Sequence, residues 1–271
     1  MPVLKASGRV ELIPPVGTVG QDVFGDILVE RIAGEGVDTS RVRRSGKLAS
    51  GMALIVVEEG TGLSTIVVDP GANMDMVPGD LDVFEPEYQG AQVALFQLEI
   101  PLEVVLEGAR RSRRMGLITV LDAGPPRGVD PALLSCFDVV SPNLDELGAL
   151  TGRVVDSTEG AVRAAGILLD AGVRMAVIKM GSAGALLALP GDTWHLPAIP
   201  VKAVDATGAG DAFTAALAVS LAGGAAPLEA VSFAVAAGAL AVTVAGALPS
   251  MPRRAGVESL LKEVDIRCLP R

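Results

Sequence analysis

The strongest candidate for chemistry is a run of small residues between two acids, at residues 205–211. The run reads DATGAGD and is followed at once by the Ala-rich segment 212–224. Glycine lets the backbone turn tightly and lets a ligand approach the exposed amides. The first amides of a helix have no partner within it and lie at the positive end of its dipole. The amides of Gly208, Ala209 and Gly210 are therefore predicted to form an anion site.

Asp211 falls in the first turn of the predicted helix, where its carboxylate would lie beside the bound anion. A carboxylate in that place can accept a proton from an attacking hydroxyl while the amides hold a phosphoryl group. The same residues also fit a small-residue loop with an acidic cap on a buried helix. Composition and spacing alone leave both interpretations open.

A second candidate pair, Asn143 and Glu146, follows the apolar run at 137–141. An amide oxygen and a carboxylate are hard ligands of the kind that Mg²⁺ prefers. The spacing of three residues equally predicts a capping box, with Asn143 as the N-cap of a helix. The two roles are compatible with each other.

From residue 93 onward, short apolar runs rich in branched side chains alternate with stretches of helical periodicity. The apolar runs are VALFQLEI, GLITVLDAG, FDVVSPN and MAVIKMG, and the helical stretches are 101–116, 144–152 and 157–172. This alternation predicts an α/β fold whose parallel sheet is covered by helices on both faces. Ligands of such sheets bind beyond the carboxyl ends of the strands. The residues expected at that edge are Glu99, Asp122, Asn143, Gly181 and the loop around Asp205.

Elements of other kinds are predicted at the two ends of the chain. Residues 21–32 have helical spacing, residues 50–69 form a strand pair around Gly60-Thr61-Gly62, and residues 257–264 form an amphipathic piece. The uncharged segments 212–228 and 230–252 approach the length of a membrane span. Their small residues favour helices packed in a core instead, so we expect no membrane span.

The charge and the cysteines limit the partners and the location. A formal charge of −10 over 271 residues argues against a nucleic-acid partner, and six Phe, one Tyr and one Trp offer no base-stacking platform. Cys136 and Cys268 form neither a metal-binding spacing nor a disulfide framework. The first residues lack the apolar stretch of a secretory signal, which favours a cytoplasmic protein.

The run DATGAGD before an Ala-rich helix resembles the C-terminal signature of the ribokinase-like, or PfkB, carbohydrate kinases. Other segments agree in order: GAN at 71–73, QLEIP at 97–101, SPNLDELGALTG at 141–152, VIKMGSAGALL at 177–187 and AAGALAVTVAGALPSMP at 236–252. The resemblance covers nearly the whole chain. It implies a single domain over 1–271 with a three-layer α/β/α fold and a mostly parallel central sheet. The strand pair at 50–69 would be a partial β lid.

The resemblance also implies a role for each candidate residue. Asp211 would be the general base, and Gly208, Ala209 and Gly210 the anion hole for the γ-phosphoryl group of ATP. Asn143 would contact the nucleotide, and Glu146 would place Mg²⁺ through water. Further nucleotide-binding residues would be Lys179, Gly181, Gly184 and Thr207, and Glu99 would contact the sugar. A monovalent cation, K⁺, would be surrounded by Asp205, Thr207, Ala241, Gly246 and Ser250.

The implied reaction is ATP-dependent phosphorylation of a sugar, with the 5-hydroxyl of ribose as the first expectation. A keto-deoxy acid or a fructose derivative is the alternative substrate, and a non-catalytic nucleotide-binding protein is the alternative function. A homodimer that pairs through residues 50–69 is also expected. The family's early Asn-x-Asp strand, its lid strand pair and its Gly-Gly-Lys-Gly-x-Asn motif have no match in this sequence. We therefore expect an N-terminally truncated kinase domain that lacks part of the sugar site and one sheet strand.

Overall fold

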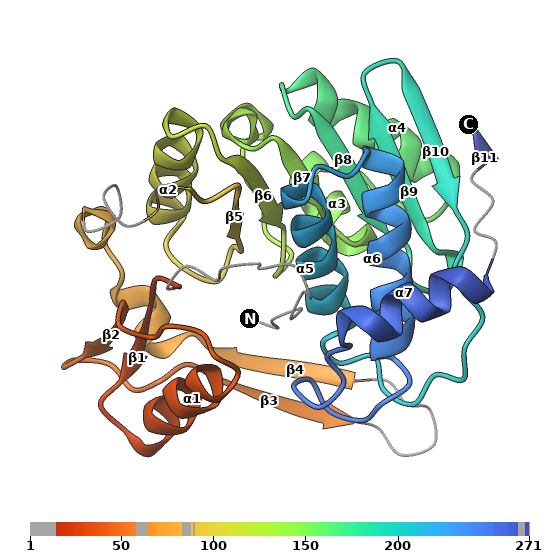
Figure 1. Ribbon diagram of the computed structural model, residues 1–271. Coiled ribbons are helices and arrows are strands. Elements are labelled where there is room, and N and C mark those ends of the chain that lie inside the picture. Colours follow the sequence, from red (N-terminus) through yellow and green to blue (C-terminus); the bar gives the residue numbers. More distant parts are fainter. Residues whose placement is uncertain (1–14, 58–63, 83–87, 89, 265–268, 271) are drawn as a thin grey trace. The chain divides into compact units, whose positions relative to one another are not determined.

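The computed structural model describes residues 15–57, 64–82, 88, 90–264 and 269–270, which form two compact units (Figure 1). The larger unit contains Gly90–Leu98 and the chain from Ala109 onward. The smaller unit contains the described residues before Gly90 together with Glu99–Gly108. The single domain expected over 1–271 stays a prediction.

The larger unit is built on a seven-stranded sheet in the order β11-β10-β9-β8-β7-β6-β5. The strands are β5 (Val93–Phe96), β6 (Ile118–Asp122), β7 (Val139–Ser141), β8 (Met175–Lys179), β9 (Ala185–Leu189), β10 (Asp192–Leu196) and β11 (Leu269–Pro270). Strands β5 to β8 pair in parallel, whereas β8 to β11 pair antiparallel. The four strands expected from the apolar runs are confirmed. The β9–β10 pair was not predicted, although Pro190-Gly191 between its strands is a turn signal.

Helices cover both faces of this sheet (Figure 1). They are α3 (Leu144–Thr151), α4 (Thr158–Asp170), α5 (Ala209–Ala222), α6 (Pro227–Ala241) and α7 (Arg254–Glu263), whereas α2 (Leu102–Arg114) is divided between the two units. Helices α5, α6 and α7 pack on one face, and α3 and α4 on the other. Val177 of β8 belongs to the core cluster beneath α5 and α6, and Ile178, which alternation turns to the opposite face, is fully buried too. The expected α/β class is confirmed.

The uncharged segments at 212–228 and 230–252 supply helices α5 and α6. Seven residues of α5 in succession, from Ala212 to Ala218, are buried. Alanine allows the two helices to approach each other and the sheet closely, because its side chain is small. Within the described part of the chain, no helix combines the length and the apolar character needed to cross a membrane.

The smaller unit contains the predicted N-terminal elements. It comprises β1 (Gly17–Gly20), α1 (Val23–Gly34), β2 (Val42–Ser45), β3 (Met52–Val57), β4 (Ser64–Asp69) and the 3₁₀ turns η1 (Gly71–Asp75) and η2 (Pro78–Leu81). Strands β1 and β2 pair in parallel, and β3 and β4 pair antiparallel. The helix predicted at 21–32 is confirmed as α1, which Asp22 caps by accepting from the Gly25 amide. Gly60-Thr61-Gly62 lies outside the described residues, and the role of the strand pair as a lid stays a prediction.

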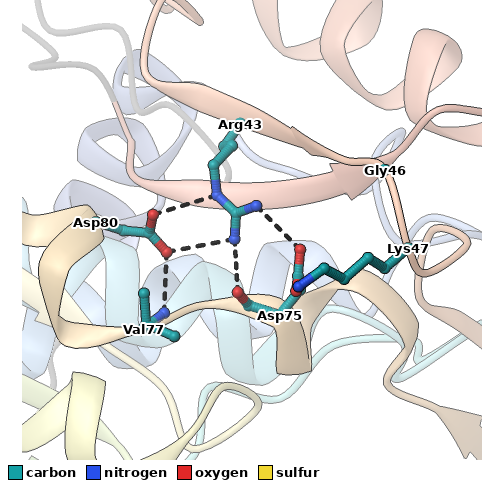
Figure 2. A pocket seen from close by; sticks show the side chains of 6 residues that line it. All are labelled: Arg43, Gly46, Lys47, Asp75, Val77 and Asp80. Atoms are coloured by element: carbon teal, nitrogen blue, oxygen red, sulfur yellow. Dashed lines mark hydrogen bonds and ion pairs between the residues drawn. The ribbon is translucent and has the colours of Figure 1, made fainter.

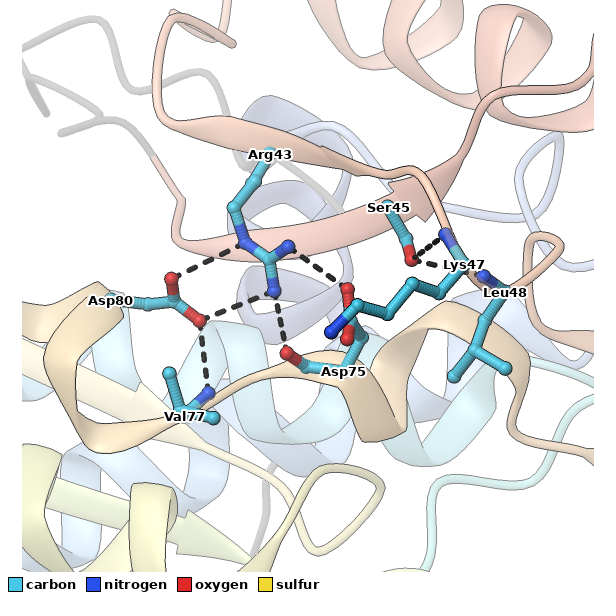
Figure 3. Close-up of polar contacts among 7 residues, drawn as sticks. All are labelled: Arg43, Ser45, Lys47, Leu48, Asp75, Val77 and Asp80. Carbon is cyan, nitrogen blue, oxygen red and sulfur yellow. Dashed lines mark hydrogen bonds and ion pairs between the residues drawn. The ribbon is translucent and has the colours of Figure 1, made fainter.

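Arg43 of β2 ties that strand to both 3₁₀ turns (Figure 2). Its guanidinium donates to Asp75 Oδ2 at 3.0 Å, to the Asp75 carbonyl at 2.6 Å and to Asp80 Oδ2 at 3.3 Å. Ser45 Oγ accepts from the amides of Lys47 and Leu48, both at 3.1 Å, and shapes the turn beside this network (Figure 3). A cavity of about 520 Å³ lies here, but two cations and two carboxylates balance each other around it. The network therefore holds the unit together rather than presenting a charged ligand site.

Replacing Arg43 with methionine is expected to lower the free energy of opening of β1 and β2 by about 1–3 kcal/mol, because Asp75 and Asp80 lose their cationic partner. Amide hydrogen exchange followed by mass spectrometry measures this change. Arg31→Met is the matched control, since Arg31 is exposed on α1 and an exposed substitution costs less than about 0.5 kcal/mol. Equal losses in the two variants would contradict a specific role for Arg43.

Candidate active site

Three parallel strands bring candidate residues to one edge of the sheet. Asp122 is the last residue of β6, Lys179 is the last residue of β8, and Asn143 follows β7 by two residues. Asn143 forms a parallel bridge with Lys179, and the Lys179 amide donates to the Pro142 carbonyl at 2.8 Å. The carboxyl ends of parallel strands meet at the same edge, so residues far apart in the sequence become neighbours there.

A buried ion pair between Asp122 and Lys179 lies at this edge. Lys179 Nζ is 2.6 Å from Asp122 Oδ1 and 3.8 Å from Glu146 Oε2. The other Asp122 oxygen accepts from Thr214 Oγ1 of α5 at 2.6 Å. The side chains of Asp122, Lys179 and Glu146 are only 12%, 13% and 9% exposed. Its place after a strand marked Asp122 in the sequence, but only the tertiary structure shows which groups it joins.

Asn143 and Glu146 form the predicted capping box at the start of α3. Asn143 Oδ1 accepts from the Glu146 amide at 2.8 Å, and Glu146 Oε2 accepts from the Asn143 amide at 2.7 Å. Glu146 Oε1 accepts from Asn143 Nδ2 at 2.9 Å, so both carboxylate oxygens are engaged. The pKa of Glu146 is raised, because burial disfavours the charged carboxylate. The Lys179 charge and the hydrogen bond from the Asn143 amide offset part of this rise.

The side-chain oxygens of Asn143 and Glu146 suit a metal ion that is bound through a water molecule. Because both Glu146 oxygens already accept hydrogen bonds, the carboxylate is better placed to hold a coordinated water than to bind the ion directly. Nowhere among the described residues do three or more His, Cys, Asp or Glu side chains gather as a metal cage. This arrangement fits Mg²⁺, which keeps several waters and binds chiefly to nucleotide phosphates.

The turn into α5 requires glycine at position 208. Gly208 is the N-cap of α5 and has a φ of 80°, in the left-handed region. A Cβ at this position would lie 2.8 Å from Met251 Cε and 3.2 Å from Ala247 Cα. The Ala209 amide donates to the Ala206 carbonyl at 3.1 Å. The amides of Gly210 and Asp211 have no hydrogen-bond acceptor in the described part of the chain, so they are available to an anion.

Asp211 lies in the first turn of α5, as the sequence predicted, and its side chain is accessible. Protein atoms around the carboxyl displace part of its hydration, which raises the pKa of Asp211 above its ordinary value. The negative charge of Asp122 raises this pKa further, and the Lys179 charge opposes the shift. A carboxylate with a raised pKa is a stronger base than an ordinary aspartate.

The segment before α5 is held to the segment after α6 by Asp205. Asp205 Oδ1 accepts from the Thr207 amide at 2.9 Å and from Thr207 Oγ1 at 2.7 Å, and Oδ2 accepts from the Gly246 amide at 2.8 Å. These hydrogen bonds lower the pKa of Asp205. The bond from the Gly246 amide has the largest effect, and those from Thr207 add to it. The Ser250 amide donates to the Gly246 carbonyl at 3.3 Å, and Ala241 ends α6. These residues lie on connected segments, and their role around K⁺ stays a prediction.

The remaining predicted residues divide between the two units. Gly181 and Gly184 form the tight turn between β8 and β9, in which the Gly184 amide donates to the Gly181 carbonyl at 3.0 Å. Their nucleotide-binding role stays a prediction. Strand β5 ends at Phe96, so Glu99 lies in a bend beyond the strand instead of at its end. Glu99 belongs to the smaller unit, and its contact with a sugar likewise stays a prediction.

We expect Asp122→Asn to lower the pKa of Asp211, because the change removes a neighbouring negative charge that raises it. In the unchanged protein, Asp211 should titrate above the ordinary aspartate pKa of about 3.9. A pH titration of the side-chain carboxyl signals by ¹³C NMR measures both values. Asp145→Asn is the control, since Asp145 is exposed on α3 and should leave the Asp211 titration unchanged. An unshifted Asp211 in the Asp122 variant would contradict the electrostatic coupling.

Comparison with known proteins gives matches over most of the chain. The sequence pattern of the pfkB family carbohydrate kinases matches residues 14–254. Ribokinase from Arabidopsis thaliana is 35% identical over 260 residues, which cover 91% of this chain and 66% of the relative. A solved structure of Arabidopsis thaliana ribokinase complexed with ribose and ATP is 34% identical, with a TM-score of 0.81. It covers 91% of this chain and 81% of that one.

The aligned part falls short of the full length of these relatives. It spans just under two thirds of the Arabidopsis thaliana ribokinase sequence. The bifunctional ribokinase/ribose-5-phosphate isomerase A of Fructilactobacillus sanfranciscensis is 30% identical over 246 residues. This alignment covers 90% of the present chain but only 45% of that relative.

Proposed function

The chain belongs to the pfkB family of carbohydrate kinases, and we propose that it transfers the γ-phosphoryl group of ATP to a sugar hydroxyl. The observation that carries the proposal is the N-terminus of α5. There, the amides of Gly210 and Asp211 lack a partner among the described residues, and the Asp211 carboxyl with its raised pKa lies in the same turn. An anion site and a base side by side are what phosphoryl transfer to a hydroxyl requires.

In the proposed reaction, Asp211 accepts the proton of the sugar hydroxyl as the sugar oxygen attacks the γ-phosphorus. The new bond joins that oxygen to phosphorus, and the bond between phosphorus and the bridging oxygen breaks. The electron pair of the broken bond leaves with ADP. Charge spreads over the three equatorial oxygens of the phosphoryl group, and the amides of the turn that Gly208 opens stabilise it.

The nucleotide and its ions are assigned to the edge of the larger unit. Asn143 and Glu146 would hold Mg²⁺ through water, and Lys179, Thr207 and the glycine turn would face the nucleotide. Bound to ATP, Mg²⁺ supplies positive charge that neutralises the phosphates. The loop around Asp205 would hold K⁺, a proposal supported by its connection to Gly246.

Ribose is the first substrate of the proposal, since the Arabidopsis thaliana ribokinase structure is a complex with ribose and ATP. A keto-deoxy acid or a fructose derivative is the alternative substrate. Because the matched part spans under two thirds of the Arabidopsis thaliana and Fructilactobacillus sanfranciscensis relatives, the activity of the whole protein is part of the proposal. Use of ATP agrees with the cytoplasmic location expected from the sequence.

The test of the proposed function is release of ADP from ATP, Mg²⁺ and K⁺ in the presence of each sugar, with ribose first. Asp211→Asn is expected to lower kcat by about 10²- to 10⁴-fold, because the variant has no base to accept the proton. Asp145→Asn, an exposed change on α3, should stay within about twofold of the unchanged protein. ATP binding without sugar-dependent ADP release would instead favour a non-catalytic nucleotide-binding protein. Full activity of Asp211→Asn would contradict the assignment of the base.

A homodimer through the β3–β4 strand pair is also proposed. Four large apolar side chains of this pair are 50–65% exposed: Met52, Leu54, Val67 and Val68. Exposed apolar surface of this kind marks interaction sites. Light scattering is expected to give twice the chain mass, and Leu54→Lys to give the mass of one chain. Val154→Lys, a control at another exposed apolar side chain, should leave the mass unchanged, and a monomeric unchanged protein would exclude the dimer.

A further inference from the structure

Lys179 points its ammonium at the first turn of α5. A Cβ built on Gly210 would lie 3.8 Å from Lys179 Nζ, so the ammonium is beside the turn that carries the free amides. The family resemblance implied a nucleotide-binding role for Lys179 but no neighbour for it on α5. Position 210 is 31 residues further along the chain. The proximity follows from the packing of α5 against β5 and β6 of the same sheet.

Asp122 fixes the direction of this ammonium. One Asp122 oxygen lies 2.6 Å from Lys179 Nζ, and the other accepts from Thr214 Oγ1 at 2.6 Å. Thr214 lies on α5 three residues after Asp211, so the carboxylate joins β8 to the helix that carries the base. Both partners are nearly enclosed, and removal of either would leave an unpaired charge in the core.

The ammonium keeps donor capacity for a ligand. An ammonium has three N–H donors, and Asp122 is its one hydrogen-bond acceptor among the described residues. Glu146 Oε2 lies 3.8 Å from Nζ, a distance for charge attraction but too long for a hydrogen bond. The positive charge of Lys179 lies near three negative carboxylates, those of Asp122, Glu146 and Asp211. Bound nucleotide phosphates would add further negative charge.

We infer that Lys179 is a catalytic residue whose ammonium, held by Asp122, contacts the transferring phosphoryl group and stabilises its charge. The inference rests on the proposed kinase function and extends the anion hole from neutral amides to a full positive charge. As the sugar oxygen bonds to phosphorus and the bridging oxygen leaves with ADP, the equatorial oxygens carry negative charge. A preorganised cation beside them lowers the barrier more than the same cation would in water. Asp122 acts through Lys179 and is a positioning residue.

The test compares Lys179→Met and Lys179→Arg with the unchanged protein. Lys179→Met is expected to lower kcat by about 10²- to 10³-fold, the loss typical of one transition-state donor, and to change the KM of the sugar by less than about threefold. Lys179→Arg should recover at least part of the lost kcat, because it restores the charge. Lys202→Met, a change at an exposed lysine, is the control and should match the unchanged protein.

A binding measurement separates this inference from the kinase proposal. Calorimetry with ADP and with a non-hydrolysable ATP analogue reports contact with the γ-phosphate without turnover. Lys179→Met is expected to weaken the analogue at least about tenfold more than ADP, and Asp122→Asn to have a smaller effect in the same direction. Equal weakening of both nucleotides, or a kcat of Lys179→Met within about threefold of the unchanged protein, would overturn the role of Lys179.

The remaining outcomes also decide between the two ideas. An unchanged protein that binds the analogue but phosphorylates no sugar would overturn the kinase proposal. The Lys179 contact would then be decided by whether Lys179→Met weakens binding of the analogue more than binding of ADP. An unchanged protein that binds neither nucleotide would overturn both. If both Lys179 variants lose their folded circular dichroism spectrum, the ion pair serves the fold, and the catalytic role is rejected.

Discussion

The candidate site depends on the buried ion pair between Asp122 and Lys179, which joins the ends of β6 and β8 to helix α5 through Thr214. Charges this enclosed lose most of their hydration and persist only with partners at hydrogen-bond distance. Because Lys179 needs Asp122 as its partner, the pair holds the ammonium beside the first turn of α5. The same pair acts in opposite senses on Asp211, since Asp122 raises its pKa and Lys179 lowers it.

Small residues make this arrangement sterically possible. Gly208 turns the chain into α5 with a left-handed φ and leaves no room for a side chain against Ala247 and Met251. A Cβ at Gly210 would lie in van der Waals contact with the Lys179 ammonium, at 3.8 Å from Nζ. The alanines of α5 and α6 then let both helices pack closely over the sheet. Small residues are therefore needed at the turn into α5 as well as in the core between the helices and the sheet.

The two units differ in how their apolar residues are used. The larger unit buries most residues of β6, β7 and β8 on both faces of the sheet. In the smaller unit, Phe24, Ile27 and Leu28 of α1 are 43–52% exposed, and cohesion comes partly from the Arg43 network. The residues proposed for phosphoryl transfer all belong to the larger unit, whereas Glu99, which is predicted to contact the sugar, belongs to the smaller one.

The sequence by itself determined the features that arise from local periodicity and local hydrogen bonding. These are the parallel strands with their covering helices, helix α1, the capping box of Asn143 and Glu146, and the glycine turn before Asp211. Only the tertiary structure decided that Asp122 meets Lys179 and Thr214, 57 and 92 residues away, and that Asp205 meets Gly246. Strand order and helix packing bring such residues together, and no local spacing in the sequence encodes either.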